Sequence, residues 1–75
     1  MRSHNAGAAK MLEQLTAREP GNGAAWRTLG LAYQHLKQAD KAIAAYQRAL
    51  AADPGMPAPI FSIGVVYAQK QEADR

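Results

Sequence analysis

The chain has 75 residues, with nine Lys or Arg against six Asp or Glu, which gives a formal net charge of +3. A chain of this length forms one small domain, near the lower size limit for a self-sufficient hydrophobic core. Because it contains no cysteine, disulfides and thiolate metal sites are excluded. Its basic residues are spread along the chain and form no phosphate-binding stripe. The sequence therefore argues against nucleic-acid binding, which we keep as a minor alternative.

The N-terminal segment MRSHNAGAAK lacks the apolar stretch of a signal peptide. No apolar run approaches the ~18 residues that a membrane span needs. We therefore expect a cytoplasmic protein without a membrane partner. Residues 1–5 are predicted to be a disordered N-terminus, residues 6–72 to form the domain, and residues 73–75 to be frayed.

The first predicted helix covers residues 6–18, where apolar side chains recur on one face. A proline and a glycine in the turn EPGN end it. Asn22 then caps a second helix over residues 23–37, which carries Trp26 and Tyr33 at helical spacing.

The third predicted helix covers residues 41–52 and follows the turn LKQAD, with Asp40 as its cap. After the turn DPGM, a fourth helix covers residues 57–71, and Pro57 suits its first turn. No segment alternates apolar and polar residues with a period of two. The sequence therefore predicts an all-α fold of antiparallel helices joined by tight turns.

An internal repeat of 34 residues relates the two halves of the chain. Laying residues 8–41 over residues 42–75 gives nine identities where chance would give roughly three. The identical pairs are Ala8/Ala42, Ala17/Ala51, Pro20/Pro54, Gly21/Gly55, Ala24/Ala58, Gly30/Gly64, Tyr33/Tyr67, Ala39/Ala73 and Asp40/Asp74. Gly30 therefore recurs, although a glycine inside a helix costs about 1 kcal/mol relative to alanine.

Residues 23–56 resemble one complete tetratricopeptide repeat (TPR). The family pattern is W-x2-L-G-x2-Y, then A-x3-F, then A and P. It is met by Trp26, Leu29, Gly30, Tyr33, Ala42, Tyr46, Ala49 and Pro54, with tyrosine for phenylalanine at Tyr46. Half repeats flank this unit: Ala8, Leu12, Leu15 and Pro20 before it, and Ile60, Ile63, Gly64 and Tyr67 after it. The resemblance implies a short right-handed solenoid of about four helices.

The small signature residues have a physical reason. Gly30, Ala42 and Ala49 remove side-chain bulk where two antiparallel helices approach, and aromatic rings fill the flanking space. We interpret the aromatic residues as core and not as a ligand-stacking site. The turn LKQAD lacks the glycine usual in the family, so Lys37 or Gln38 has to end the second helix without it.

Catalytic and metal-binding patterns are missing from the sequence. His4 and His35 have no partner at i, i+4, and no serine has the setting of a nucleophile. We predict no enzyme activity, no catalytic residue, no cofactor and no metal site.

In TPR proteins the first helix of each repeat lines a concave groove that takes peptides or helices. By this resemblance the groove would be lined by Ala24, Arg27, Leu31, Gln34, His35, Ala58, Phe61, Val65, Ala68 and Gln69. Family members that bind chaperones grip a terminal carboxylate with lysine, asparagine and arginine. Here Leu31 stands where asparagine is needed, which argues against chaperone binding. An apolar groove for an amphipathic helix or extended segment fits better.

The fourth predicted helix is apolar on nearly all sides, and we expect such a helix to be buried on all sides. Ile60, Ile63 and Tyr67 are expected to face the repeat stack, and Phe61, Val65 and Val66 to point elsewhere. Three explanations stay open: a longer array, a homodimer, or a modest exposed patch. We predict a protein-interaction scaffold, with a self-associating structural domain as the alternative. The partner's identity cannot be read from the sequence.

Overall fold

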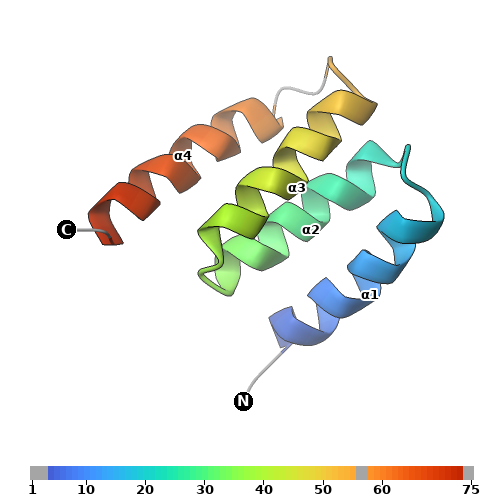
Figure 1. Ribbon diagram of the computed structural model, residues 1–75, viewed down its shortest axis with the longest axis horizontal. Helices are drawn as coiled ribbons and strands as arrows, with labels where there is room; N and C mark the ends of the chain where they lie inside the picture. The colour runs from blue at the N-terminus through green and yellow to red at the C-terminus, as the bar shows by residue number, and fades with distance from the viewer. Residues whose placement is uncertain (1–3, 56–57, 74–75) are drawn as a thin grey trace.

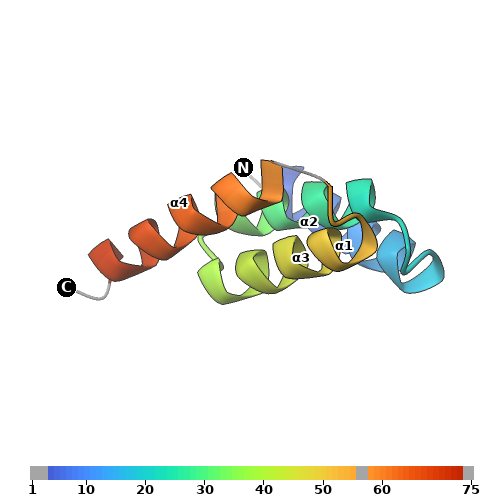
Figure 2. The same cartoon turned by 90° about the horizontal axis from the view of Figure 1, so that it is seen from above.

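The computed structural model describes residues 4–55 and 58–73, and the side chains of residues 7–55 and 62–71. Its helices are α1 (His4–Arg18), α2 (Gly23–His35), α3 (Ala39–Ala52) and α4 (Ala58–Ala73). Each helix packs on its neighbour in sequence, and the four lie side by side in chain order (Figure 1). Seen from above, α2 and α4 lie on the same side of α3 (Figure 2). The fold is the predicted all-α helical repeat.

The helix ends differ slightly from the predicted ones, and α2 shows why. It ends at His35 and not at residue 37, because Lys37 adopts the left-handed conformation with φ of 61°. The Lys37 N–H donates to the Gln34 carbonyl at 3.0 Å, and the Gln38 N–H donates to the Tyr33 carbonyl at 2.9 Å. This pair of hydrogen bonds is a Schellman motif, here with lysine where glycine is usual.

The start of α2 is capped as predicted, whereas the start of α3 is not. The Asn22 side chain accepts a hydrogen bond from the Ala25 N–H at 3.1 Å. Asp40 was expected to cap α3, but that helix begins at Ala39, and Gln38 at the cap position makes no side-chain cap bond. Asp40 lies in the first turn, where the negative charge of its carboxylate interacts favourably with the helix dipole. The carboxylate also accepts a hydrogen bond from Lys70 Nζ at 2.5 Å.

The first and last helices also differ from the predicted ranges. Helix α1 starts at His4, so residues 4 and 5 are helical, and α4 runs from Ala58 to Ala73. Residues 1–3, 56–57 and 74–75 lie outside the described part, so the expected disorder of residues 1–3 and the expected role of Pro57 are not addressed by it.

The tightest contact in the fold lies between α2 and α3. Tyr46 is 1% exposed, and Ala42 and Ala49 are fully buried beside it. A Cβ atom built on Gly30 would lie 2.7 Å from two atoms of the Tyr46 ring. The ring thus occupies the space that the missing side chain of Gly30 leaves, which explains a glycine inside this helix.

Helix α4 packs on α3 with a face that differs in part from the one expected, since Ile63 packs against the α3 residues as predicted but two other residues do not follow the prediction. Val66, expected to point away from the stack, is 1% exposed and packs in a cluster with Ala42, Ile43 and Tyr46. Tyr67, expected to face the stack, is 49% exposed. Because the described part of α4 packs mainly on α3, the side of the helix that carries Val66 is buried and the side that carries Tyr67 is not.

Candidate functional site

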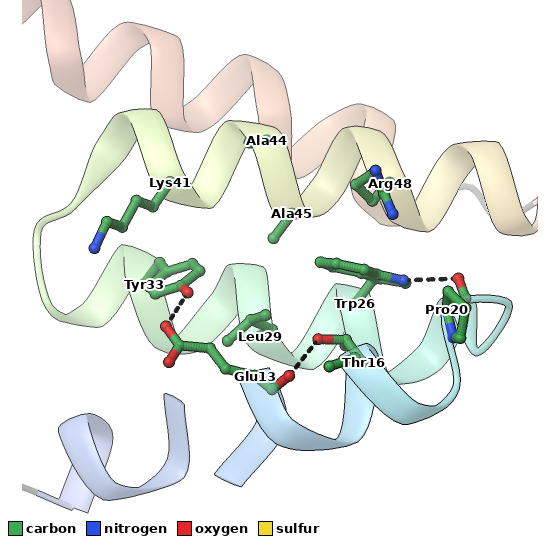
Figure 3. A pocket seen from close by; sticks show the side chains of 11 residues that line it. Glu13, Thr16, Pro20, Trp26, Leu29, Tyr33, Lys41, Ala44, Ala45 and Arg48 are labelled. Atoms are coloured by element: carbon green, nitrogen blue, oxygen red, sulfur yellow. Dashed lines mark hydrogen bonds between the residues drawn. The ribbon is translucent and has the colours of Figure 1, made fainter. Parts of the chain in front are cut away.

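Within the described residues, a hollow lies between α1 and α3, with α2 as its floor (Figure 3). We call it the α1–α3 hollow; its volume is about 530 Å³. It is lined by Glu13, Thr16, Ala17, Pro20, Trp26, Leu29, Tyr33, Lys41, Ala44, Ala45 and Arg48. The small side chains of alanines on the walls leave this volume empty. Two half-buried aromatic rings lie on the floor, one at each end.

Polar contacts fix the two rings. Trp26 Nε1 donates to the Pro20 carbonyl at 2.9 Å, and the Arg48 guanidinium lies 4.8 Å from the centre of the Trp26 ring. At the other end of the floor, the Tyr33 hydroxyl donates to the Glu13 carboxylate, and Lys41 Nζ lies 5.7 Å from the centre of the Tyr33 ring. Both rings are therefore covered by cations from α3.

The Tyr33 contact has an electrostatic consequence. Burial, followed by the hydrogen bond to Glu13 and its negative charge, raises the pKa of Tyr33 to about 12. Each of these effects disfavours the phenolate. Near neutral pH, Tyr33 is therefore a fixed hydrogen-bond donor that ties α2 to α1.

The predicted groove residues come from α2 and α4. Ala24, Leu31 and His35 are exposed, with Leu31 at 44%, whereas Arg27 and Gln34 are half-buried. On α4, Val65 is half-buried and Ala68 and Gln69 are exposed. The side chains of Ala58 and Phe61 lie outside those described. We call the described members of this set the α2–α4 face.

Gln34 and Gln69 are brought together at one end of the α2–α4 face. They line a smaller hollow of about 290 Å³ with Lys37, Ala39, Val66 and Lys70. This end is more polar than the apolar groove that the sequence led us to expect. The Tyr46 hydroxyl reaches it from the core and donates to Gln34 Oε1 at 2.8 Å. Burial raises the pKa of Tyr46, while Ser62 and the charge of Arg27 act in the opposite direction.

The α1–α3 hollow was not predicted from the sequence. Trp26 and Tyr33 were expected to be core, but both are half-buried and line the hollow. One signal could have pointed to it. Lys41 and Arg48 stand seven residues apart on one side of α3, with only alanines between them on that side. A row of such small side chains on α3 leaves empty space next to the side of α2 that carries Trp26 and Tyr33.

The described residues contain neither a metal-binding cluster nor a membrane-spanning helix. No group of three or more His, Cys, Asp or Glu in that part of the chain could hold a metal ion. No helix described there is long and apolar enough to cross a membrane.

The consecutive antiparallel pairs, with one helix shared by neighbouring contacts, define a helical-repeat solenoid. The chain matches the family model described as Tetratricopeptide repeat over residues 2–57, and it belongs to that family. No curated protein and no solved structure matches the chain. The family is typically a non-catalytic scaffold, and its domains serve generally as protein-interaction modules. The match covers all three helices that line the α1–α3 hollow.

Proposed function

We propose that the chain is a scaffold that binds a protein segment along the α2–α4 face. The observation that carries the proposal is Leu31, a large apolar side chain that is 44% exposed in the middle of α2. Val65 on α4 is a second apolar side chain of this face and is half-buried, and both helices lie on the same side of α3 (Figure 2). Exposed apolar side chains rimmed by polar ones are typical of partner-binding surfaces.

The face favours a partner with mixed chemistry. Leu31 and Val65 suit one or two apolar anchors, and the amides of Gln34 and Gln69 suit hydrogen bonds beside them. The bond from the Tyr46 hydroxyl holds Gln34 in place before a partner arrives. Such fixed polar groups reduce the entropy lost on binding. An amphipathic helix or a short extended segment would meet both requirements.

A displayed library of random peptides tests this proposal, because it samples many partner chemistries at once. Peptides selected on the 75-residue chain are expected to lose at least about tenfold in affinity for Leu31→Arg, since a long cation replaces the apolar anchor. Gln47→Arg is the matched control, because it adds the same charge at an exposed position on α3. Unchanged affinity for Leu31→Arg would exclude the α2–α4 face.

The α1–α3 hollow is a second candidate for the same function, favoured by its volume of about 530 Å³ and its aromatic floor. Tryptophan, tyrosine and arginine are the residues most enriched where binding energy concentrates, and Trp26, Tyr33 and Arg48 stand together here. An apolar side chain with an acidic neighbour would suit the floor and the cations of α3.

Ala44→Arg separates the two candidates. Ala44 is exposed and lines the hollow, so an arginine there fills it without touching the α2–α4 face. If the selected peptides bind in the hollow, Ala44→Arg abolishes binding and Leu31→Arg does not. Retained binding by Ala44→Arg excludes the hollow.

A further inference from the structure

One side of α1 has no neighbour among the described residues, although it carries apolar side chains. Ala8 is exposed, Met11 is 71% exposed and Leu15 is half-buried. The 34-residue register gives each of them a counterpart on α3. The counterparts are Ala42, Ala45 and Ala49, which are 0%, 2% and 0% exposed where α3 meets α2. The open side of α1 thus corresponds to the side with which α3 covers α2.

Helix α4 has the matching open side. Gly64 and Tyr67 are exposed and correspond in register to Gly30 and Tyr33, residues of α2 that α3 covers. Ile63, the counterpart of Leu29, is half-buried and already packs against the cluster that contains Ala42 and Tyr46 of α3. A Cβ built on Gly64 meets nothing within 4 Å, whereas one built on Gly30 would overlap the Tyr46 ring. The close-packing position is therefore present on α4, but no side chain described in the chain fills it.

We propose that α1 of a second copy of this chain docks on α4, antiparallel to it, in the way that α3 docks on α2. The new contact continues the stack in which α1 packs on α2, α2 on α3 and α3 on α4. Leu12 holds the register position of Tyr46, so it would lie over Gly64 of the other copy. Within its own chain Leu12 already packs against a cluster that includes Leu29 and Ala32 of α2, as Tyr46 packs in a cluster with Val66 of α4.

The polar pair of the internal contact supports this occupant. Between α2 and α3, the Tyr46 hydroxyl donates to Gln34. The register positions of these two residues hold Leu12 on α1 and Ala68 on α4. Both register positions hold apolar side chains, so the docked pair would leave no buried amide or hydroxyl without a partner.

The two faces differ from each other, so the contact is head-to-tail and does not close as a symmetric dimer. Each added copy exposes a fresh α4, and the stack grows with concentration. Sedimentation of the 75-residue chain from micromolar to millimolar concentration should give a weight-average mass that rises steadily from the 8.1 kDa of one chain to more than twice that value. A mass of one chain throughout this range would overturn the proposal.

Two variants that each spoil one face make the test specific. Met11→Glu places a charge on α1 and leaves α4 intact. Gly64→Glu places bulk and charge on α4, in space that is open in the single chain, and leaves α1 intact. Each variant alone should remain at the mass of one chain. An equal mixture should form a dimer and grow no further, because only one productive contact is available.

Gln47→Glu, at an exposed position on α3, is the control and should assemble like the parent. Far-UV circular dichroism should show the parent's helicity in all three variants. Association of Met11→Glu with itself would point to an α4–α4 contact and overturn the proposal. A mixture that stays at the mass of one chain would overturn it as well.

Discussion

Helices α2 and α4 occupy the same place in the 34-residue repeat, yet their surroundings differ. Helix α2 packs on both α1 and α3, and its Gly30 lies under the Tyr46 ring. In its described part, helix α4 packs mainly on α3, and its Gly64 is open. The same pattern therefore produces a buried contact in one place and an exposed apolar side in the other. A repeat signature specifies which face can be covered, and neighbouring helices decide whether it is.

The largest expected effect comes from removing the ring that covers α2. Tyr46→Ala should lower the free energy of unfolding by about 3–5 kcal/mol, because it empties a fully buried site. Tyr67→Ala removes a half-exposed ring from α4 and should change stability by less than about 0.5 kcal/mol in the single chain. Urea denaturation at low protein concentration measures both. Similar losses for the two variants would contradict the difference between the helices.

The two glycines allow the same substitution to be compared directly. Gly30→Ala should destabilise by about 1–3 kcal/mol, because its Cβ would meet the buried Tyr46 ring at 2.7 Å. Gly64→Ala should stabilise by up to about 1 kcal/mol, since alanine favours the helix and nothing stands in its way. Opposite signs in thermal denaturation are the expected result. A gain at both positions would show that α2 and α3 are not closely packed.

The end of α2 offers a smaller gain. Lys37→Gly should stabilise by about 1 kcal/mol, because glycine adopts the φ of 61° without the steric penalty that lysine bears. The matched control is Gln47→Gly, in the middle of α3, which should destabilise by a similar amount. If Lys37→Gly also destabilises, the left-handed turn between α2 and α3 is absent in solution.

The smallest expected effect is a dependence on alkaline pH at the contact between α2 and α1. Tyr33 has a pKa of about 12 in the folded chain and 10.0 as its ordinary value. The unfolded chain loses this proton first, so the stabilisation by neutral Tyr33 is complete below pH 10 and declines between 10 and 12. Tyr33→Phe should show a shallower fall in melting temperature over that range. An identical fall in both proteins would exclude this role of Tyr33.

The sequence was informative about the helices because proline and glycine mark the turns and Asn22 has the right chemistry for a cap. It was less informative about α3, because Gln38 shows no capping preference and Asp40 does. The orientation of α4 could not be derived, since a helix that is apolar on nearly all sides has no preferred phase. Val66 was therefore assigned to the wrong side.

The candidate sites, too, were predicted in one part from the sequence and missed in another. The positions of Leu31 and Gln34 along α2 follow from helical spacing and the repeat register. The α1–α3 hollow depends on how far two helices that are not neighbours in sequence stand apart, and on the small side chains of both. Residue types alone do not fix that separation, and Trp26 and Tyr33 read equally well as core.

Trp26 is the single tryptophan of the chain, and it borders the α1–α3 hollow beneath Arg48. All indole fluorescence therefore originates from one known place. An apolar group that entered the hollow would displace water from the ring and shift the emission to shorter wavelength. A segment bound only along the α2–α4 face would leave that emission nearly unchanged. The protein thus carries its own optical reporter for which of its two surfaces a partner occupies.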